Sequence, residues 1–201
     1  QNYLTGFIPA EVGNLTALTY LSVFLNDITG SIPSEIGQLR AMSVLDLDYN
    51  LLTGTIPDEV GHLTALVALY IGNGFVTGTI PNLASLTRLE SLYIYSNQIK
   101  GTIPNDMWQL SSLVIFSASN NELTGTIPSV ISHLTRIWDF VLYNNYLTGS
   151  IPSDMWNLAT LQAIVFDNNI LTGTIEKTVG QVTDVDLFYL HNNHLSGIIP
   201  S

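Results

Sequence analysis

Aromatic and acidic residues recur at alternate positions between apolar ones, as in Asp46-Leu47-Asp48 and Tyr93-Ile94-Tyr95. This alternation is the period of a β-strand, whose successive side chains point to opposite faces. Rigid aromatic rings with polar tips are favoured at interfaces. We therefore expect an outward strand face that binds a ligand through Tyr20, Phe24, Asp46, Asp48, Tyr70, Tyr93, Tyr95, Asp139, Tyr143, Asp167, Tyr189 and His191.

Within this set, Tyr70, Tyr93 and Tyr95 are expected on adjacent strands as the densest patch. The alternative is that tyrosine simply suits a half-exposed strand. Asp46 and Asp48 lie two strand rises apart, roughly 7 Å, and could meet a basic peptide or Ca²⁺. Calcium needs six or more oxygen ligands, so these acids, and Asp139 and Asp167 like them, are interpreted as solvated.

Catalytic and metal-binding patterns are not found. The chain has no cysteine, and no serine stands in a repeated relation to a histidine and an acid. His62 and His133 occupy a convex repeat position where other units carry Asn or Gln, so they are interpreted as exposed polar residues. His191 and His194 lie three residues apart but not on a helix, which is a weak signal for a metal site. We predict a non-enzymatic protein with no cofactor and no metal.

The charge balance narrows the partners. Sixteen acidic residues against five Lys and Arg give a net charge of −11. Nucleic acid and anionic membranes attract basic surfaces, so neither is an expected partner. The chain has no apolar run of about 18 residues, so no membrane span is predicted.

A regular glycine period shows which elements position these residues. The spacing is 24 residues, except for 23 between Gly78 and Gly101. A period of this length indicates stacked repeats that bury their apolar edges against one another. The glycines are Gly6, Gly30, Gly54, Gly78, Gly101, Gly125, Gly149, Gly173 and Gly197.

Each unit combines two extended segments and a helical turn. Leu45 and Leu47 mark the first strand, and Ile56 lies in a second extended segment. Pro57 suits the first position of a short helical or 3-10 turn, and the acids that follow such prolines face the positive end of the helix dipole. The Asn four residues before nearly every Gly, as at Asn50, is expected to pair inward-facing backbone groups.

The consensus Leu-x-x-Leu-x-Leu-x-x-Asn-x-Leu-Thr-Gly-x-Ile-Pro resembles the plant-type extracellular leucine-rich repeat, found in receptor-like kinase ectodomains and polygalacturonase-inhibiting proteins. The resemblance covers essentially the whole chain. It implies an α/β solenoid: a right-handed leucine-rich-repeat superhelix with a concave parallel sheet, short second strands and convex 3-10 or helical turns. It also implies recognition of a protein, peptide or glycan, at an extracellular or cell-surface location. Asn14-Leu15-Thr16 is a glycosylation sequon on the convex side, which predicts a glycan at Asn14.

Several departures from the family pattern bear on domain organisation. Cysteine-bearing caps are absent, so residues 1–201 are interpreted as a single array of about eight 24-residue repeats, an uncapped fragment of a longer protein. End-to-end stacking into a structural or adhesion array, or association of the receptor type, is an alternative. Glu176 replaces proline, which predicts a looser turn, and the unit after Pro81 lacks one residue, which predicts a trimmed convex turn.

An alternative function is ice binding. Thr-x-Thr pairs such as Thr53 with Thr55 and Thr77 with Thr79 would stack into an array of methyls and hydroxyls at strand spacing. Lys100 interrupts this row of threonines.

Overall fold

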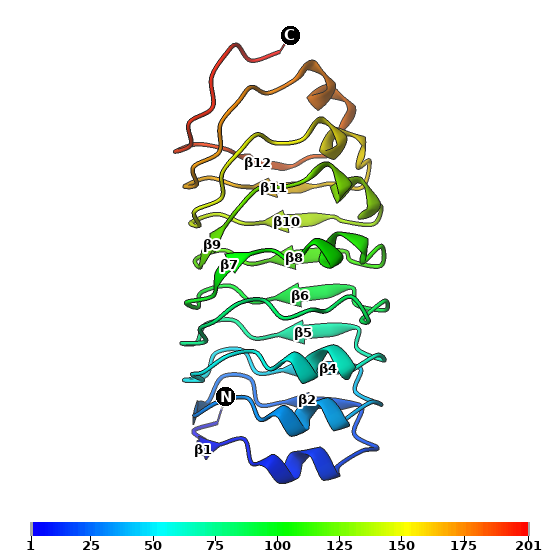
Figure 1. Cartoon of the computed structure of the whole chain (residues 1–201), viewed down its shortest axis with the longest axis vertical. Coiled ribbons are helices and arrows are strands. Elements are labelled where there is room, and N and C mark those ends of the chain that lie inside the picture. The colour runs from blue at the N-terminus through cyan, green and yellow to red at the C-terminus, as the bar shows by residue number, and fades with distance from the viewer. Residues whose placement is uncertain (1, 201) are drawn as a thin grey trace.

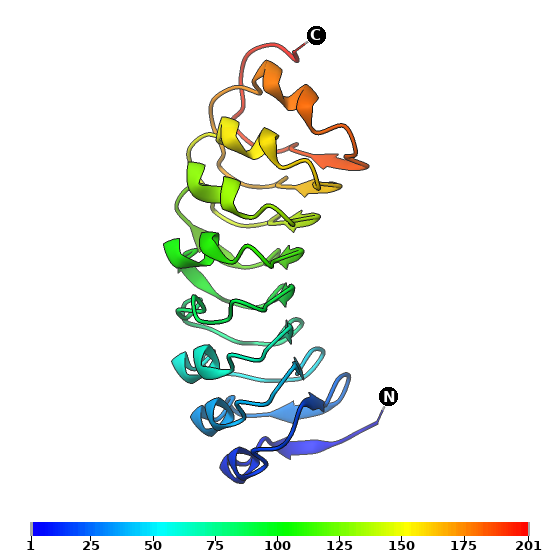
Figure 2. The same ribbon diagram turned by 90° about the vertical axis from the view of Figure 1, so that its right-hand side faces the viewer.

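The computed structural model describes residues 2–200, so the terminal residues Gln1 and Ser201 of the expected array lie outside the described part. The described chain is a single elongated coil whose successive turns stack along the long axis (Figure 1). Strands line one side of the stack and short helices the other, as the turned view shows (Figure 2). The solenoid predicted from the glycine period is confirmed.

The concave side is one parallel sheet of eight short strands in the order β12-β11-β10-β8-β6-β5-β4-β2. Its register places the middle residues of neighbouring strands opposite one another, for example Leu45, Leu69 and Leu92. All three are fully buried, whereas the residues on either side of them face the opposite way. The strands are β2 (Tyr20–Ser22), β4 (Val44–Asp46), β5 (Ala68–Tyr70), β6 (Ser91–Tyr93), β8 (Ile115–Ser117), β10 (Asp139–Val141), β11 (Ala163–Val165) and β12 (Leu187–Tyr189).

The second extended segments form a lateral face beside this sheet. β1 (Thr5–Phe7) pairs with β3 (Asp27–Thr29), and β7 (Lys100–Thr102) pairs with β9 (Glu122–Thr124). Isolated parallel bridges such as Thr55 with Thr77 continue the pairing elsewhere.

The repeated glycine is required by this lateral segment. Gly78 has a φ of +80°, a left-handed conformation that side chains disfavour. A Cβ there would also lie 2.6 Å from the Thr55 Cγ2 of the preceding turn. The period therefore marks the points where two turns come closest.

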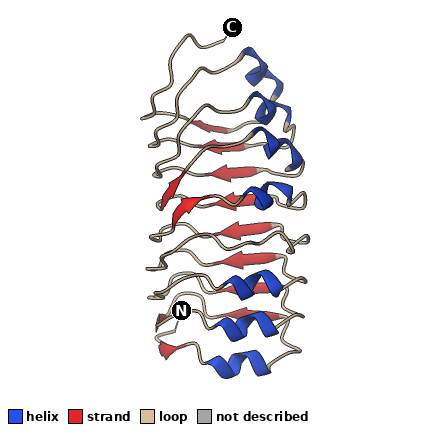
Figure 3. Ribbon diagram, viewed as in Figure 1, coloured by secondary structure: helices blue, strands red, loops and turns tan. Residues whose placement is uncertain are grey.

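The convex side is a row of 3-10 helices, which confirms the helical turns predicted after proline (Figure 3). Glu176 precedes η7 with the same extended backbone as the prolines, so the predicted loosening is not seen. Within residues 2–200, no helix has the length and apolar character needed to cross a membrane. The helices are η1 (Ala10–Asn14), η2 (Ser34–Gln38), η3 (Asp58–His62), η4 (Asn105–Gln109), η5 (Ser129–His133), η6 (Ser153–Asn157) and η7 (Lys177–Gln181).

The row of helices is interrupted once. Residues 82–86 form no 3-10 helix, because the unit that contains them is one residue short. Asn82 instead caps the following turn by accepting a hydrogen bond from the Ala84 N–H at 2.9 Å, and the Ser85 hydroxyl donates to the Gly61 carbonyl of the turn before. The predicted trimming of this turn is confirmed.

The interior is filled by columns of apolar side chains. Phe140 packs between Phe116 and Phe166, with ring centroids 5.9 and 4.9 Å apart. Trp108 and Trp156 are each only 1% exposed, so these convex tryptophans belong to the core.

An asparagine ladder closes the inner backbone. The Asn145 amide donates to the carbonyls of Ala118, Leu142 and Tyr143, and its Oδ1 accepts from the Leu123 N–H at 2.9 Å. Asn50, Asn121 and Asn169 repeat this pattern in other turns. The predicted structural role of these residues is confirmed.

Candidate functional site

Three tyrosines gather at the centre of the concave sheet, and we call Tyr70, Tyr93 and Tyr95 the tyrosine cluster. Tyr70 on β5 and Tyr93 on β6 stack with centroids 5.1 Å apart and an interplanar angle of 23°. Tyr95 meets Tyr93 edge to face at 6.1 Å. All three remain half-exposed. The adjacency predicted for these residues is confirmed; whether they bind a ligand stays a prediction.

Desolvation changes the acid–base properties of the cluster. Partial burial raises the pKa of Tyr70, and of Tyr93, whose pKa is raised further by Tyr70 and by the charges of Asp139 and Asp48. Burial and the neighbouring Asp48 charge raise the pKa of Tyr95 as well. All three hydroxyls are therefore protonated at neutral pH, which leaves those of Tyr70 and Tyr93 able to donate hydrogen bonds to a ligand.

Asp48 is a structural acid, and its interpretation as solvated is wrong. Only 5% of the residue is exposed. Its Oδ1 accepts from the Gly72 N–H, and its Oδ2 accepts from the Tyr95 hydroxyl at 3.0 Å. Burial raises the pKa of the Asp48 carboxyl, although these two bonds oppose the rise. The Tyr95 ring crosses β5 to reach it.

Gly72 makes this crossing possible. A Cβ at Gly72 would lie 2.6 Å from Asp48 Oδ1 and 2.8 Å from the Tyr95 ring. The absent side chain therefore lets Tyr95 lie across the sheet. The sequence contained a signal for this contact, since glycine stands at the repeat position where the neighbouring units carry Asp48 and Tyr95. The contact itself could not be predicted, because it depends on the rotamer of Tyr95.

Asp167 is also buried, 7% exposed, which again corrects its interpretation as a solvated acid. It accepts a hydrogen bond from Asn168 Nδ2 at 2.6 Å and lies 3.5 Å from His191 Nε2. His191 in turn contacts Tyr189 edge to face at 6.3 Å. These C-terminal members of the predicted set form a group separate from the tyrosine cluster.

Asp46 and Asp139 remain accessible on the concave face. Asp46 Oδ2 accepts from the Ser22 hydroxyl at 2.8 Å, and Asp46 Oδ1 accepts from the Asp48 N–H at 3.3 Å. Asp139 makes no side-chain hydrogen bond or ion pair with other residues in the 2–200 range. Partial burial raises the pKa of Asp139.

The remaining predicted residues lie at the margins. Tyr20 and Phe24 are exposed near the N-terminal end of the sheet, and Phe24 meets Tyr49 edge to face at 5.4 Å. The Tyr143 hydroxyl accepts a hydrogen bond from Asn120 Nδ2 at 3.2 Å. Tyr49 was not predicted, because it follows the strand in a left-handed position with φ +54°, where most units carry Asn. Its aromatic identity was the available signal.

The predicted glycosylation site lies on the convex side. Asn14 ends η1 and is exposed, together with Leu15 and Thr16. Exposure is the condition for modification, and glycosylation itself remains a prediction.

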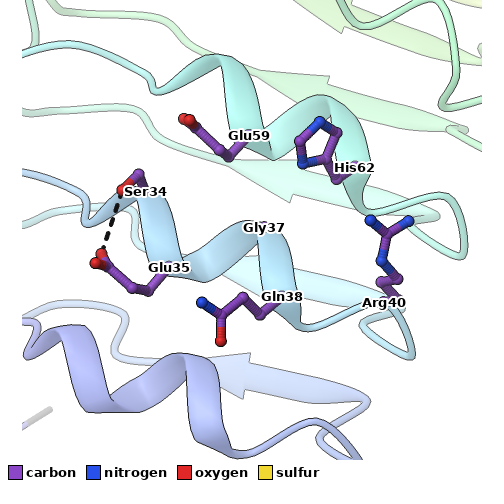
Figure 4. Close-up of a pocket in the computed structure, with 7 residues that line it drawn as sticks. All are labelled: Ser34, Glu35, Gly37, Gln38, Arg40, Glu59 and His62. Carbon is purple, nitrogen blue, oxygen red and sulfur yellow. Dashed lines mark hydrogen bonds between the residues drawn. The ribbon is translucent and has the colours of Figure 1, made fainter.

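The convex helices also border an open trough of about 350 Å³ between η2 and η3, lined by polar side chains. Figure 4 shows Glu35 and Glu59 apart from His62 and Arg40, with only Ser34 and Glu35 hydrogen-bonded among the residues drawn, at 3.3 Å. Among the described residues, no three His, Asp or Glu converge as a metal site. The trough presents no converging set of groups, and the concave face is the stronger candidate.

Comparison with protein families identifies this architecture. Residues 6–101 match a family model described as a leucine-rich repeat region, and residues 112–134 match the leucine-rich repeat model. A comparison with curated proteins finds no match. The chain belongs to the leucine-rich-repeat family, with repeats of the plant type.

Solved structures show the same relationship. A TDR receptor is 31% identical with a TM-score of 0.96 over 98% of this chain and 34% of its own. The Arabidopsis receptor kinase HAESA ectodomain, solved with an extended IDA peptide hormone, is 29% identical with a TM-score of 0.96 over 100% of this chain and 34% of its own. The chain thus spans about a third of these ectodomains. A plant ice-binding protein is 25% identical, with a TM-score of 0.84 over 98% of this chain and 64% of its own.

Proposed function

We propose that this chain is an extracellular recognition module, without catalytic activity, that binds a peptide or protein through its concave face. The observation that carries the proposal is the tyrosine cluster at the centre of that face. Stacked, half-exposed rings offer apolar area at little entropic cost because they are already ordered by one another and by Asp48.

The structural neighbours support a peptide ligand over a glycan. The HAESA ectodomain was solved with a peptide hormone, and the plant peptide hormone receptor RGFR1 was solved in complex with RGF2. This chain corresponds to part of those ectodomains, so its ligand, its cell-surface location and any receptor-type association are proposals. Nothing in these neighbours supports end-to-end association.

A randomised 12-residue peptide library panned against the chain tests this function. Selected peptides should lose affinity by at least about tenfold, or roughly 1.4 kcal/mol, when Tyr70→Ala and Tyr93→Ala are combined, because the stacked rings provide the contact. Isothermal titration calorimetry measures the loss.

Phe75→Ala with Tyr146→Ala is the matched control, because both aromatics are exposed away from the concave strands. Both double variants are first compared by thermal unfolding. Selected peptides that tolerate the concave variant but not the control would contradict the proposal.

Ice binding is the second candidate, and the ice-binding neighbour is the observation that keeps it. The threonine ladder argues against it. The Thr29 and Thr77 hydroxyls donate to the Gly6 and Gly54 carbonyls, both at 2.9 Å, and the Thr55 methyl packs against the next turn at Gly78. These three threonines contact the neighbouring turns, so part of the ladder has a structural explanation.

A further inference from the structure

The concave face carries negative charge without compensation. Its outward strand positions include Asp46, Asp48, Asp139 and Asp167 but no Lys or Arg. Lys100 lies on lateral β7, and Arg136 is 3.5 Å from Glu90. The other basic residues are outside the concave strands as well: Arg40, Arg88 and Lys177.

Tyr93 on β6 and Asp139 on β10 border β8 on its two sides. The β8 residue beside Tyr93 is Ser117, which is small and buried, and Asp139 lies two residues along the strands, beside Ile115. Two strand spacings separate those borders, about 10 Å across the sheet.

The two borders differ in chemistry but suit one kind of group. Tyr70 covers the β5 side of the Tyr93 ring, so the opposite ring face is turned toward β8. A cation is attracted to an aromatic face within about 6 Å of its centroid, and it pairs with a carboxylate at about 2.8 Å. These lengths allow one cation over β8 to contact both groups.

Asp139 has an unmet interaction on this face. It is half-buried and makes no side-chain hydrogen bond or ion pair with any other residue from 2 to 200, unlike Asp48 and Asp167. A ligand that brings a positive charge would supply the missing partner.

We propose that the concave face recognises a basic extended peptide and seats an Arg or Lys side chain over β8, between the Tyr93 ring and the Asp139 carboxylate. This inference rests on the proposed peptide-binding function and specifies the ligand class. Asp46 is accessible and lies one strand from Tyr70 and two strands from Tyr93. It provides a second point of attraction for the basic peptide.

The test uses three synthetic peptides, Ac-Gly-Arg-Gly-Arg-Gly-Arg-Gly-NH2 and its citrulline and glutamate counterparts. Citrulline keeps the size and shape of arginine without its charge. In calorimetric titrations at low salt, the arginine peptide should bind at least about fivefold more tightly than the citrulline peptide. The glutamate peptide should not bind.

Variants locate the charge recognition. Asp139→Asn and Tyr93→Leu should each weaken arginine-peptide binding about fivefold, whereas Tyr93→Phe keeps the ring face and should retain binding. Asp58→Asn removes the same charge from exposed η3 and should leave binding unchanged. Thermal unfolding checks that each variant is folded.

Three results would overturn the inference: no binding of the arginine peptide, equal binding of the citrulline peptide, or equal weakening by Asp58→Asn and Asp139→Asn. The last would mean diffuse attraction to a chain of net charge −11. None of them affects the library experiment, which uses peptides of any charge. Failure of both the arginine-peptide titration and the library experiment would contradict the concave binding function itself.

Discussion

At the scale of single residues, asparagine is the residue on which the turns most depend. Asn145 is 5% exposed and satisfies four backbone groups. The ladder was predictable from sequence because each Asn repeats at a fixed distance from a glycine, and the backbone groups it pairs recur with it.

Asn145→Ala should lower the free energy of unfolding by about 3 kcal/mol, since buried donors and acceptors lose their partner. Urea denaturation followed by circular dichroism measures the change. Asn157→Ala, at an exposed position in η6, is the control and should change stability by less than about 0.5 kcal/mol. Similar losses in both variants would mean that the ladder is not a stabilising element.

The acids show where residue-level prediction failed. Alternation correctly placed Asp48 and Asp167 on the concave side, but it could not show their burial. For Asp48 the burial depends on a ring from two strands away, and for Asp167 on Asn168 and His191. Such contacts are set by rotamers and by neighbouring turns, which a single repeat does not specify.

At the scale of elements, Asp48 joins three strands. Its carboxylate follows β4, the Gly72 N–H follows β5, and the Tyr95 hydroxyl follows β6. Burial disfavours the charged form, so the pKa of Asp48 lies above its ordinary value of 3.8. Asp46 and Tyr95 are the titratable neighbours that act on the Asp48 carboxyl.

This shift has a defined effect on stability. A carboxyl with a raised folded-state pKa contributes its full stability below pH 3.8 and loses it as the pH rises through the folded-state pKa. Asp48→Asn keeps an acceptor for Gly72 and removes the buried charge. The variant should therefore melt higher than the parent at pH 7, with the difference shrinking as the pH falls through the folded-state pKa to 3.8 and staying constant below it.

Thermal unfolding at pH 7 and at a pH below 3.8 checks this prediction, with exposed Asp58→Asn as the control. A difference between Asp48→Asn and the parent that is the same at both pH values would contradict it.

At the scale of the whole molecule, the period alone predicts a stacked coil with strands on one side and helical turns on the other. It also places the tyrosine cluster, because register in a parallel array fixes which residues are neighbours. The ligand is not encoded in the period. The ligand depends on the residues that differ between turns. Because those residues do not repeat, the repeat pattern gives no information about their role.

The ice-binding alternative is also argued at this scale, because an ice-binding face must be matched over many turns. The hydroxyls that bond to glycine carbonyls are not free for this, and Lys100 interrupts the row of threonines. We expect no thermal hysteresis and no shaping of ice crystals in nanolitre osmometry. A clear effect that Thr53→Lys or Thr126→Lys abolishes would reverse this conclusion.

The missing helix behind the tyrosine cluster has a mechanical consequence. In an arc, the outer rim must be longer than the inner one, and bulky convex turns keep it so. The turn at residues 82–86 has no helix and joins β5 to β6, the strands that carry Tyr70 and Tyr93. We therefore expect the stack to be flatter here, so that bending of the solenoid changes the separation of those two rings.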